Sequence, residues 1–205
     1  MNESGNQCSW RRDANGFSMI ELLIVVAIVI ILTAAAVFTL SPQRRAYRTD
    51  DAASQVTNFM RDAYQRALSQ RQTMRVQIDR ANMLIKIIDE NRLPVGDEIE
   101  VRRAKLNDEI SLNQPTAGAG LLNPPAAPYN YPAAGYSNNL WEARFRSDGS
   151  VVDNAGNPLS ATLFFSLVNM NSSDSNLIRA VTLFGPSGSV RVWRYTGQSF
   201  DAGAN

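Results

Sequence analysis

From Leu22 to Leu40 all but two residues are apolar, and no charge occurs between Glu21 and Arg44. As a helix, residues 17–40 would span roughly 36 Å, enough for the ~30 Å hydrocarbon core of a bilayer. β-Branched residues are frequent in this run, but a strand of 4–8 residues would be far shorter. Mean hydropathy over the 205 residues is nevertheless −0.21. The chain is therefore expected to join an N-terminal membrane helix to a polar domain.

Two ordinary interpretations of the apolar run leave features unexplained. A secretory signal peptide would account for Arg11 and Arg12 before the run and for the small residues of 34–36 after it. The run, however, exceeds the ~7–15 residues of a signal-peptide core, and Glu21 lies inside its start. A plain transmembrane anchor explains the length, but neither Glu21 nor Gly16.

The third interpretation begins with Glu21. A carboxylate in an apolar helix costs ~2.5 kcal/mol or more near the bilayer centre and less near the interface, so it needs a partner. The segment Gly16-Phe17-Ser18-Met19-Ile20-Glu21, followed by an uninterrupted apolar helix, resembles the class III prepilin signature of type IV pilins and type II secretion pseudopilins. The resemblance implies that Gly16 ends the leader and that Phe17 becomes an N-methylated N-terminus. It also implies that Glu21 pairs with the α-ammonium of a neighbouring subunit during assembly.

The resemblance also implies partners and a location. The partners are other pilin or pseudopilin subunits, a prepilin peptidase/N-methyltransferase, an inner-membrane assembly platform and membrane lipid before assembly. The location is the bacterial inner membrane, single-pass with a periplasmic head, and then the filament. Basic residues flank the apolar run on both sides, so the positive-inside rule is ambiguous and the leader motif sets the orientation. Cleavage would remove the only cysteine, Cys8.

The remaining chain is expected to fold as an α+β domain. Pro42 is expected to interrupt the helix. Apolar residues then recur every three or four positions over 50–70, which predicts an amphipathic helix. From Thr73 the period becomes two, which predicts strands and a hairpin around the turn at 79–82. The expected strands are 74–78, 83–88, 98–101, 110–112, 140–146, 162–168, 177–184 and 190–195. Helix first and strands afterwards indicate a helix packed on an antiparallel sheet.

Four segments follow from these patterns together with what the resemblance to type IV pilins implies. They are a cleaved leader, 1–16; a transmembrane and assembly helix, 17–41; its amphipathic continuation, 42–72; and a β-rich periplasmic head, 73–205. Within the head, residues 113–139 carry no charge and five prolines, and are expected to form a partly ordered surface insertion pinned by its tyrosines.

A more specific resemblance lies in the head. Phe145-Arg146-Ser147-Asp148-Gly149-Ser150 and, further on, residues 181–190 (VTLFGPSGSV) are similar to the general secretion pathway protein H / FimT group of minor pilins and pseudopilins. The expected function is that of a minor pilin-like structural subunit of a type II secretion pseudopilus or a type IV pilus.

Several classes of chemistry have no support in the sequence. There is no histidine, one cysteine and no phosphate-binding or nucleophile-elbow motif, so no enzyme, cofactor or metal is expected. Asp148, Asp153 and Asn157 lie in turns, and their spacing does not match a calcium loop. The acidic pairs at 50–51 and 108–109 are interpreted as solvent-exposed residues at the ends of a helix or loop.

DNA binding is the alternative function. Net charge is only +1, yet the chain after residue 16 has 16 arginines and two lysines. FimT-type pilins that take part in DNA uptake tend to carry Gly-Arg-x-Arg near the C-terminus. Here the matching stretch is Gly188-Ser189-Val190-Arg191 with Arg194 after it, and the first arginine is missing. Arg191 and Arg194 are the candidate DNA contacts; the competing interpretation makes them outward residues of a strand.

Overall fold

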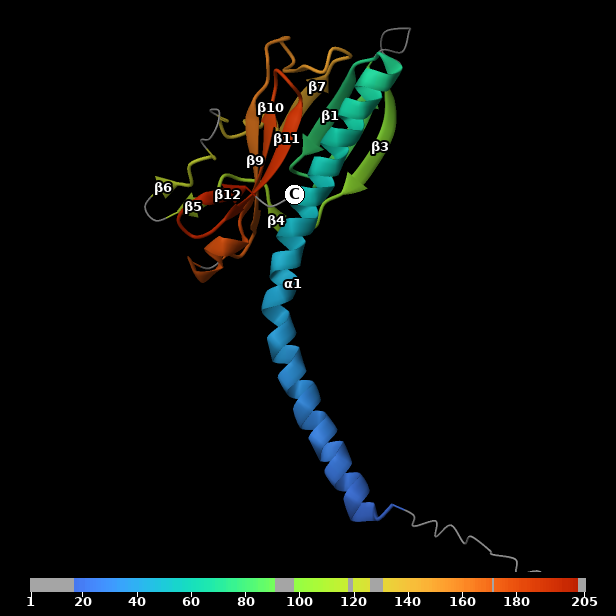
Figure 1. Cartoon of the computed structure of the whole chain (residues 1–205), viewed down its shortest axis with the longest axis vertical. Coiled ribbons are helices and arrows are strands. Elements are labelled where there is room, and N and C mark those ends of the chain that lie inside the picture. The colour runs from blue at the N-terminus through green and yellow to red at the C-terminus, as the bar shows by residue number, and fades with distance from the viewer. Residues whose placement is uncertain (1–16, 91–97, 118–119, 126–130, 171, 203–205) are drawn as a thin grey trace, which may run out of the picture. The chain divides into compact units, whose positions relative to one another are not determined.

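The computed structural model describes residues 17–90, 98–117, 120–125, 131–170 and 172–202, with backbone alone for 35–43, 117 and 172–173 (Figure 1). The chain divides into two compact units, Met1–Pro42 and Gln43–Asn205. The leader, including Gly16 and Cys8, lies outside the described residues.

In the first unit the described backbone is helical from Met19 onward. Its large apolar side chains, from Phe17 to Leu32, are 45–85% exposed. Among the residues searched, no helical stretch has both the length and the hydropathy of a membrane span.

Helix α1 runs from Met19 to Gln70 without a break, so the prediction that Pro42 interrupts it is wrong. A proline removes one backbone hydrogen bond and crowds the preceding turn, at a cost of about 3 kcal/mol. Because the helical turns before and after Pro42 make their own hydrogen bonds, they hold the backbone helical across it. The helix ends where Arg71 adopts the left-handed conformation (φ 54°) and the Gln72 amide donates to the Ala67 carbonyl. This is the usual C-terminal capping arrangement, with arginine in the place of glycine.

The predicted amphipathic half of α1 is confirmed. Its buried stripe follows the expected spacing and packs in one core with residues from both large sheets. The buried residues of this stripe are Ala52, Ala53, Val56, Phe59, Met60, Ala63 and Ala67.

The first large sheet has the order β3-β2-β1-β7-β8 and is antiparallel throughout. Its strands are β1 (Met74–Asp79), β2 (Leu84–Asp89), β3 (Ile99–Lys105), β7 (Leu140–Phe145) and β8 (Val151–Val152). The predicted hairpin is present as β1–β2. Alternate residues of β1 and β7 are buried, because one face of the sheet meets the core.

The second large sheet has the order β12-β11-β10-β9-β4. Its strands are β4 (Ile110–Ser111), β9 (Ala161–Leu167), β10 (Arg179–Phe184), β11 (Ser189–Tyr195) and β12 (Phe200–Ala202). A 3₁₀-helix, η1 (Ser172–Leu177), precedes β10 within the segment predicted as a turn. The α+β class with a helix on antiparallel sheets is confirmed, with two sheets instead of one.

The uncharged insertion explains why β9 is buried along its whole length. Within it lies a short hairpin of β5 (Thr116–Ala117) and β6 (Gly120–Leu121). Along the edge of β9 away from β10, Thr162 exchanges backbone bonds with Pro132 and Ala134, and its hydroxyl donates to the Tyr131 carbonyl. A second apolar cluster forms beneath this cover; its buried members are Leu122, Phe164, Ile178, Ala180, Trp193 and Tyr195. Tyr131 is 3% exposed, and Tyr129 lies outside the described residues.

Candidate functional site

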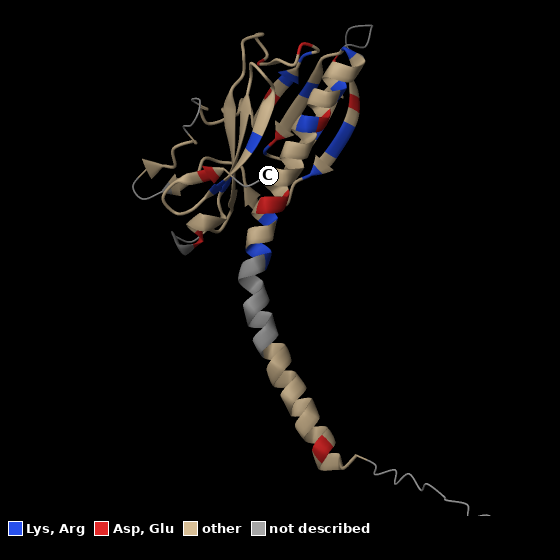
Figure 2. Cartoon of the chain, in the orientation of Figure 1, with Lys and Arg blue, Asp and Glu red and all other residues tan. Residues whose placement is uncertain are grey.

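The N-terminal candidates Phe17 and Glu21 lie at the start of α1. Ser18 precedes the helix, and its carbonyl accepts the Leu22 amide at 3.1 Å. Glu21 is therefore in the first turn, where a carboxylate interacts favourably with the positive end of the helix dipole. Phe17 is 75% exposed. In Figure 2 the described part of this apolar stretch shows one acidic position, near its start, and no basic one.

An apolar helix exposed on all sides needs a cover. Isolated apolar residues are normal on a protein surface, but a continuous surface of this kind marks contact with lipid or with other chains. Thr33 does not break the pattern, because its hydroxyl donates to the Val29 carbonyl at 2.6 Å. Glu21 is the exception, since its carboxylate would be costly under such a cover unless a cation meets it.

A set of ion pairs ties α1 to the rest of the second unit over residues 45–50. Arg45 pairs with Asp174 in η1 at 3.0 Å and also donates to the Asn169 carbonyl. Arg48 pairs with Glu109 just before β4. Asp50 pairs with Arg179 on β10. We call these three the junction ion pairs. The interpretation as a solvated end is corrected for Asp50, whose carboxylate is held by the buried Arg179. Glu109 is exposed, as predicted, and is paired with Arg48.

Arg179 is the most buried charge of the described residues, with 2% of its surface exposed. Its Nε and Nη2 donate to the two carboxylate oxygens of Asp50, and Nη1 donates to the carbonyls of Asn176 and Ile178. A buried guanidinium is tolerated only when it is paired and hydrogen-bonded in this way. Arg179 therefore joins α1, the end of η1 and β10.

Arg191 and Arg194 do not form one surface. Both are exposed on β11, but the continuous register with β10 places Arg191 opposite Thr182 and Arg194 opposite Arg179. Side chains alternate between the faces of a strand, and three positions separate these two arginines. They therefore point to opposite faces. The outer face carries Arg191 beside Trp193, whose indole N–H donates to the Thr182 hydroxyl at 2.9 Å.

Charged side chains form a network on the solvent side of the first sheet. Arg75 pairs with Glu90, Glu98 and Glu142, and Arg144 donates to Glu90 at 2.8 Å. Burial disfavours the ionised carboxylate of Glu142. Hydrogen bonds from Asn154 and Gln77 and the charges of Arg75 and Arg144 outweigh that effect, so the pKa of Glu142 is lowered.

The two turn aspartates hold their own turns. Asp148 accepts the amide and hydroxyl of Ser150, and Asp153 accepts the amides of Ala155 and Asn157. These hydrogen bonds stabilise the ionised form and lower the pKa of both carboxyl groups, chiefly through Ser150 for Asp148 and through Asn157 for Asp153. Over the described residues, no group of three or more acidic, cysteine or histidine side chains is arranged to hold a metal.

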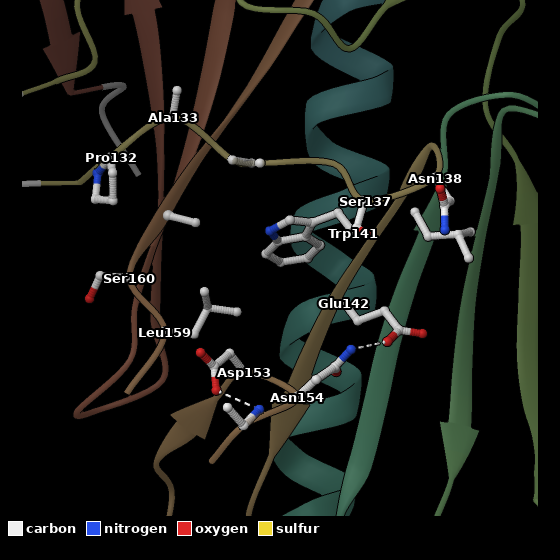
Figure 3. A pocket seen from close by; sticks show the side chains of 15 residues that line it. Pro132, Ala133, Ser137, Asn138, Trp141, Glu142, Asp153, Asn154, Leu159 and Ser160 are labelled. Carbon is white, nitrogen blue, oxygen red and sulfur yellow. Dashed lines mark hydrogen bonds between the residues drawn. The ribbon is translucent and has the colours of Figure 1, made fainter. Parts of the chain in front are cut away.

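A groove of about 550 Å³ opens beside β7, between the insertion and the beginning of β9 (Figure 3). The Trp141 indole, Leu159 and the strap of residues 132–137 surround it in the figure. Among its lining residues the charged ones are Glu142 and Asp153, both acidic.

The comparison that decides the nature of the N-terminus is with a family model. The model described as the prokaryotic N-terminal methylation motif matches residues 11–37. Residues 11–37 therefore carry this N-terminal methylation motif. The match confirms the predicted prepilin leader motif and spans the two positions of the expected cleavage site as well as Glu21.

The chain was also compared with solved structures and with curated sequences. The type IV minor pilin FimU of Pseudomonas aeruginosa is 12% identical, with 74% of this chain and 91% of that chain covered and a TM-score of 0.46. The minor pseudopilin EpsH of the Vibrio cholerae type 2 secretion system is 13% identical, with 71% and 95% covered and a TM-score of 0.45. No curated protein matches significantly.

Sequence reasoning missed Arg179 and the groove. Arg179 had a local signal, since it is the charged first residue of a strand of mostly buried residues. Its partner Asp50 lies 129 residues earlier and could not be named from the pattern. The groove had no signal, because its walls, all within residues 132–161, include loop segments without a periodic pattern.

Proposed function

We propose that this chain is a minor pilin-like structural subunit of a type IV pilus or a type II secretion pseudopilus. The N-terminal methylation motif over residues 11–37 carries the proposal. Prepilin peptidase cleaves between Gly16 and Phe17 and methylates the new amine. The chain is then held in the inner membrane by its apolar helix, single-pass with a periplasmic head, until an assembly platform passes it to a filament.

Glu21 supplies the selectivity of assembly in this proposal. Close van der Waals packing of the exposed apolar side chains of residues 17–32 against neighbouring helices provides the attraction, because lipid is itself apolar and gives no hydrophobic drive. The carboxylate of Glu21 pairs with the α-ammonium of Phe17 of an adjacent subunit. In a low-dielectric bundle an unpaired charge is costly, so the pair favours one axial register over others.

Sequencing the N-terminus of the membrane-extracted protein tests the processing step. A start at N-methyl-Phe17 is expected. A start at Val37 would indicate signal peptidase cleavage after residues 34–36, and a start at Met1 would indicate no cleavage; either result overturns the proposal.

The assembly role is tested with Glu21→Gln, which keeps the size of the side chain and removes its charge. Cleavage is expected to continue, while incorporation into filaments falls at least about tenfold, as for the loss of one buried charge pair. Thr33→Val is the matched control, because it removes a polar group whose hydroxyl is already satisfied within the helix. Incorporation of the Glu21 variant at the level of the Thr33 variant would exclude the role.

The geometry does not favour the DNA-binding alternative. Arg191 and Arg194 lie on opposite faces of β11. One DNA backbone therefore cannot contact both side chains as it would contact two arginines on the same face.

A further inference from the structure

We infer that Tyr64 of α1 and two turns of the head form a clasp that fixes α1 along its axis against both large sheets. The turns are residues 146–150, between β7 and β8, and residues 185–188, between β10 and β11. They belong to the two stretches that are similar to the general secretion pathway protein H / FimT group, and the proposed function gives these stretches no role. The inference goes beyond that function, because it concerns the head alone and holds whether or not the chain assembles.

The ring of Tyr64 fills the space that two turn glycines leave free. A Cβ atom built at Gly149 would lie 3.2 Å from the Tyr64 hydroxyl oxygen. One built at Gly188 would lie 2.6 and 2.7 Å from the Cε2 and Cδ2 atoms of the same ring. A methyl group added at Gly188 would therefore have to displace the ring or the turn, which is the usual cost of overpacking. One side chain of α1 thus contacts both turns.

Backbone conformation alone does not account for this fit. Gly149 and Gly188 have positive φ, 83° and 62°, which favours glycine in a turn. Gly197 also has positive φ, 96°, but a Cβ atom built there would meet nothing closer than the Ser175 hydroxyl oxygen at 3.8 Å. At Gly188 the contact with Tyr64 is a second requirement, separate from the turn.

The two turns are joined to each other, and they come from different sheets. The Val151 amide, at the start of β8 in the first sheet, donates to the Gly185 carbonyl at 2.7 Å, and Gly185 directly follows β10 of the second sheet. A Cβ atom built at Gly188 would lie 2.9 Å from the Gly149 carbonyl oxygen, so the turns pack directly against each other. Movement of Tyr64 along the axis of α1 is therefore opposed by turns from both sheets.

The buried stripe at this end of α1 would oppose such a movement only weakly. Beyond Met60 it consists of Ala63 and Ala67, and side chains this small form low ridges that interlock little with the surface they pack on. The junction ion pairs attach α1 further back, with Asp50 about 21 Å from Tyr64 along the helix axis. The clasp and the junction ion pairs therefore hold α1 at two separate points.

Urea unfolding of the full chain in nonionic detergent tests whether the ring and the turns act as one unit. Gly188→Ala should raise the unfolding equilibrium constant at least about tenfold more than Gly197→Ala, which places a methyl group in open space at a positive φ. In a Tyr64→Ala background the same Gly188 substitution should cost at least about fivefold less, because the ring that it meets is gone. Equal costs in the two backgrounds would exclude the clasp.

The axial role is tested by pulling on the two ends of the full chain at constant force with optical tweezers, which loads α1 along its length. Tyr64→Ala should raise the rate at which α1 leaves the head at least about tenfold. Tyr47→Ala is the matched control, because it makes the same change on the same helix at a side chain that is 69% exposed, and it should alter the rate by about twofold at most. Gly188→Ala disturbs the clasp from the side of the turn and should speed release more than Gly197→Ala.

Leu122→Ala separates the clasp from general stability. It weakens the second apolar cluster, which contains no residue of α1, and should therefore speed release less than Tyr64→Ala does. Two results of the pulling experiment would overturn the inference. They are release of the Tyr64→Ala chain at the rate of the Tyr47→Ala chain, and equal release rates for the Tyr64→Ala and Leu122→Ala chains.

Discussion

Asp50 and Asp51 are adjacent carboxylates whose surroundings differ completely. Asp50 receives the guanidinium of Arg179, whereas Asp51 is exposed. Breaking a fully buried ion pair costs about 3–5 kcal/mol, and because the Asp50 side chain is 45% exposed, water compensates part of the loss. We expect Asp50→Asn to reduce the free energy of unfolding by about 2 kcal/mol.

Urea unfolding of the full chain in nonionic detergent measures this effect. Asp51→Asn is the control and should stay within about 0.5 kcal/mol of the parent chain. Trypsin supplies a local readout, because loss of the pair should speed cleavage after Arg45 and Arg48 more than after Arg61. Equal unfolding curves for the two variants would contradict the role given to Arg179.

At the scale of elements, the insertion acts as part of the core. Leu121 and Leu122 are consecutive, yet Leu121 is 61% exposed and Leu122 is 6% exposed in the cluster with Trp193 and Tyr195. Leu122→Ala should therefore lower the free energy of unfolding by about 2–3 kcal/mol, through lost burial and the cavity left behind.

Leu121→Ala is the matched control, with an expected change of about 0.5 kcal/mol or less. Both are measured by urea unfolding with Trp193 fluorescence as a local probe. If the two alanine variants lose equal stability, the insertion does not cover the second sheet as described.

The sequence predicts best those strands that have one face buried in the core and the other exposed to solvent. In β1 the apolar residues Met74, Val76 and Ile78 alternate with polar residues, so the sequence itself shows a hydrophobic period of two. β9 was predicted as a strand, but it is buried on both faces, and its second cover comes from a segment without a periodic pattern. β8 and β12 are too short to show a period.

The residues of the candidate site also differ in how far the sequence could predict them. Phe17 and Glu21 belong to a contiguous motif, so the sequence was enough to name them. Arg191 and Arg194 were grouped by proximity in sequence, but the odd spacing of a strand separates them. The Asp50–Arg179 pair depends on long-range packing, which local patterns do not record.

For the molecule as a whole, at pH 8 and below, stability should depend on pH only at the acid side. The chain has no histidine, so no such group titrates between pH 6 and 8. The pKa values of Asp62, Asp79, Glu142, Asp148 and Asp153 are all lowered in the folded chain. The folded state then binds fewer protons than the unfolded state, and stability falls as pH falls through the folded pKa values.

We expect an almost constant melting temperature from pH 8 to about 5 and a steep decline below about pH 4. Differential scanning calorimetry in nonionic detergent measures it. Glu142→Gln should reduce the dependence on pH, because it removes one group that must take up a proton. A melting temperature that stays level down to pH 3 would refute this account.

The junction ion pairs also bear on the order in which the chain is made. Arg45 donates to a carbonyl 124 residues further along, and Asp50 receives a guanidinium 129 residues further along. The ribosome must therefore finish most of the protein before residues 45–50 can find their partners. Contacts of such long separation slow folding. The first sheet, which begins at Met74, can cover part of the apolar stripe of α1 early, but the part of the core that the second sheet supplies forms only after β10 has been made.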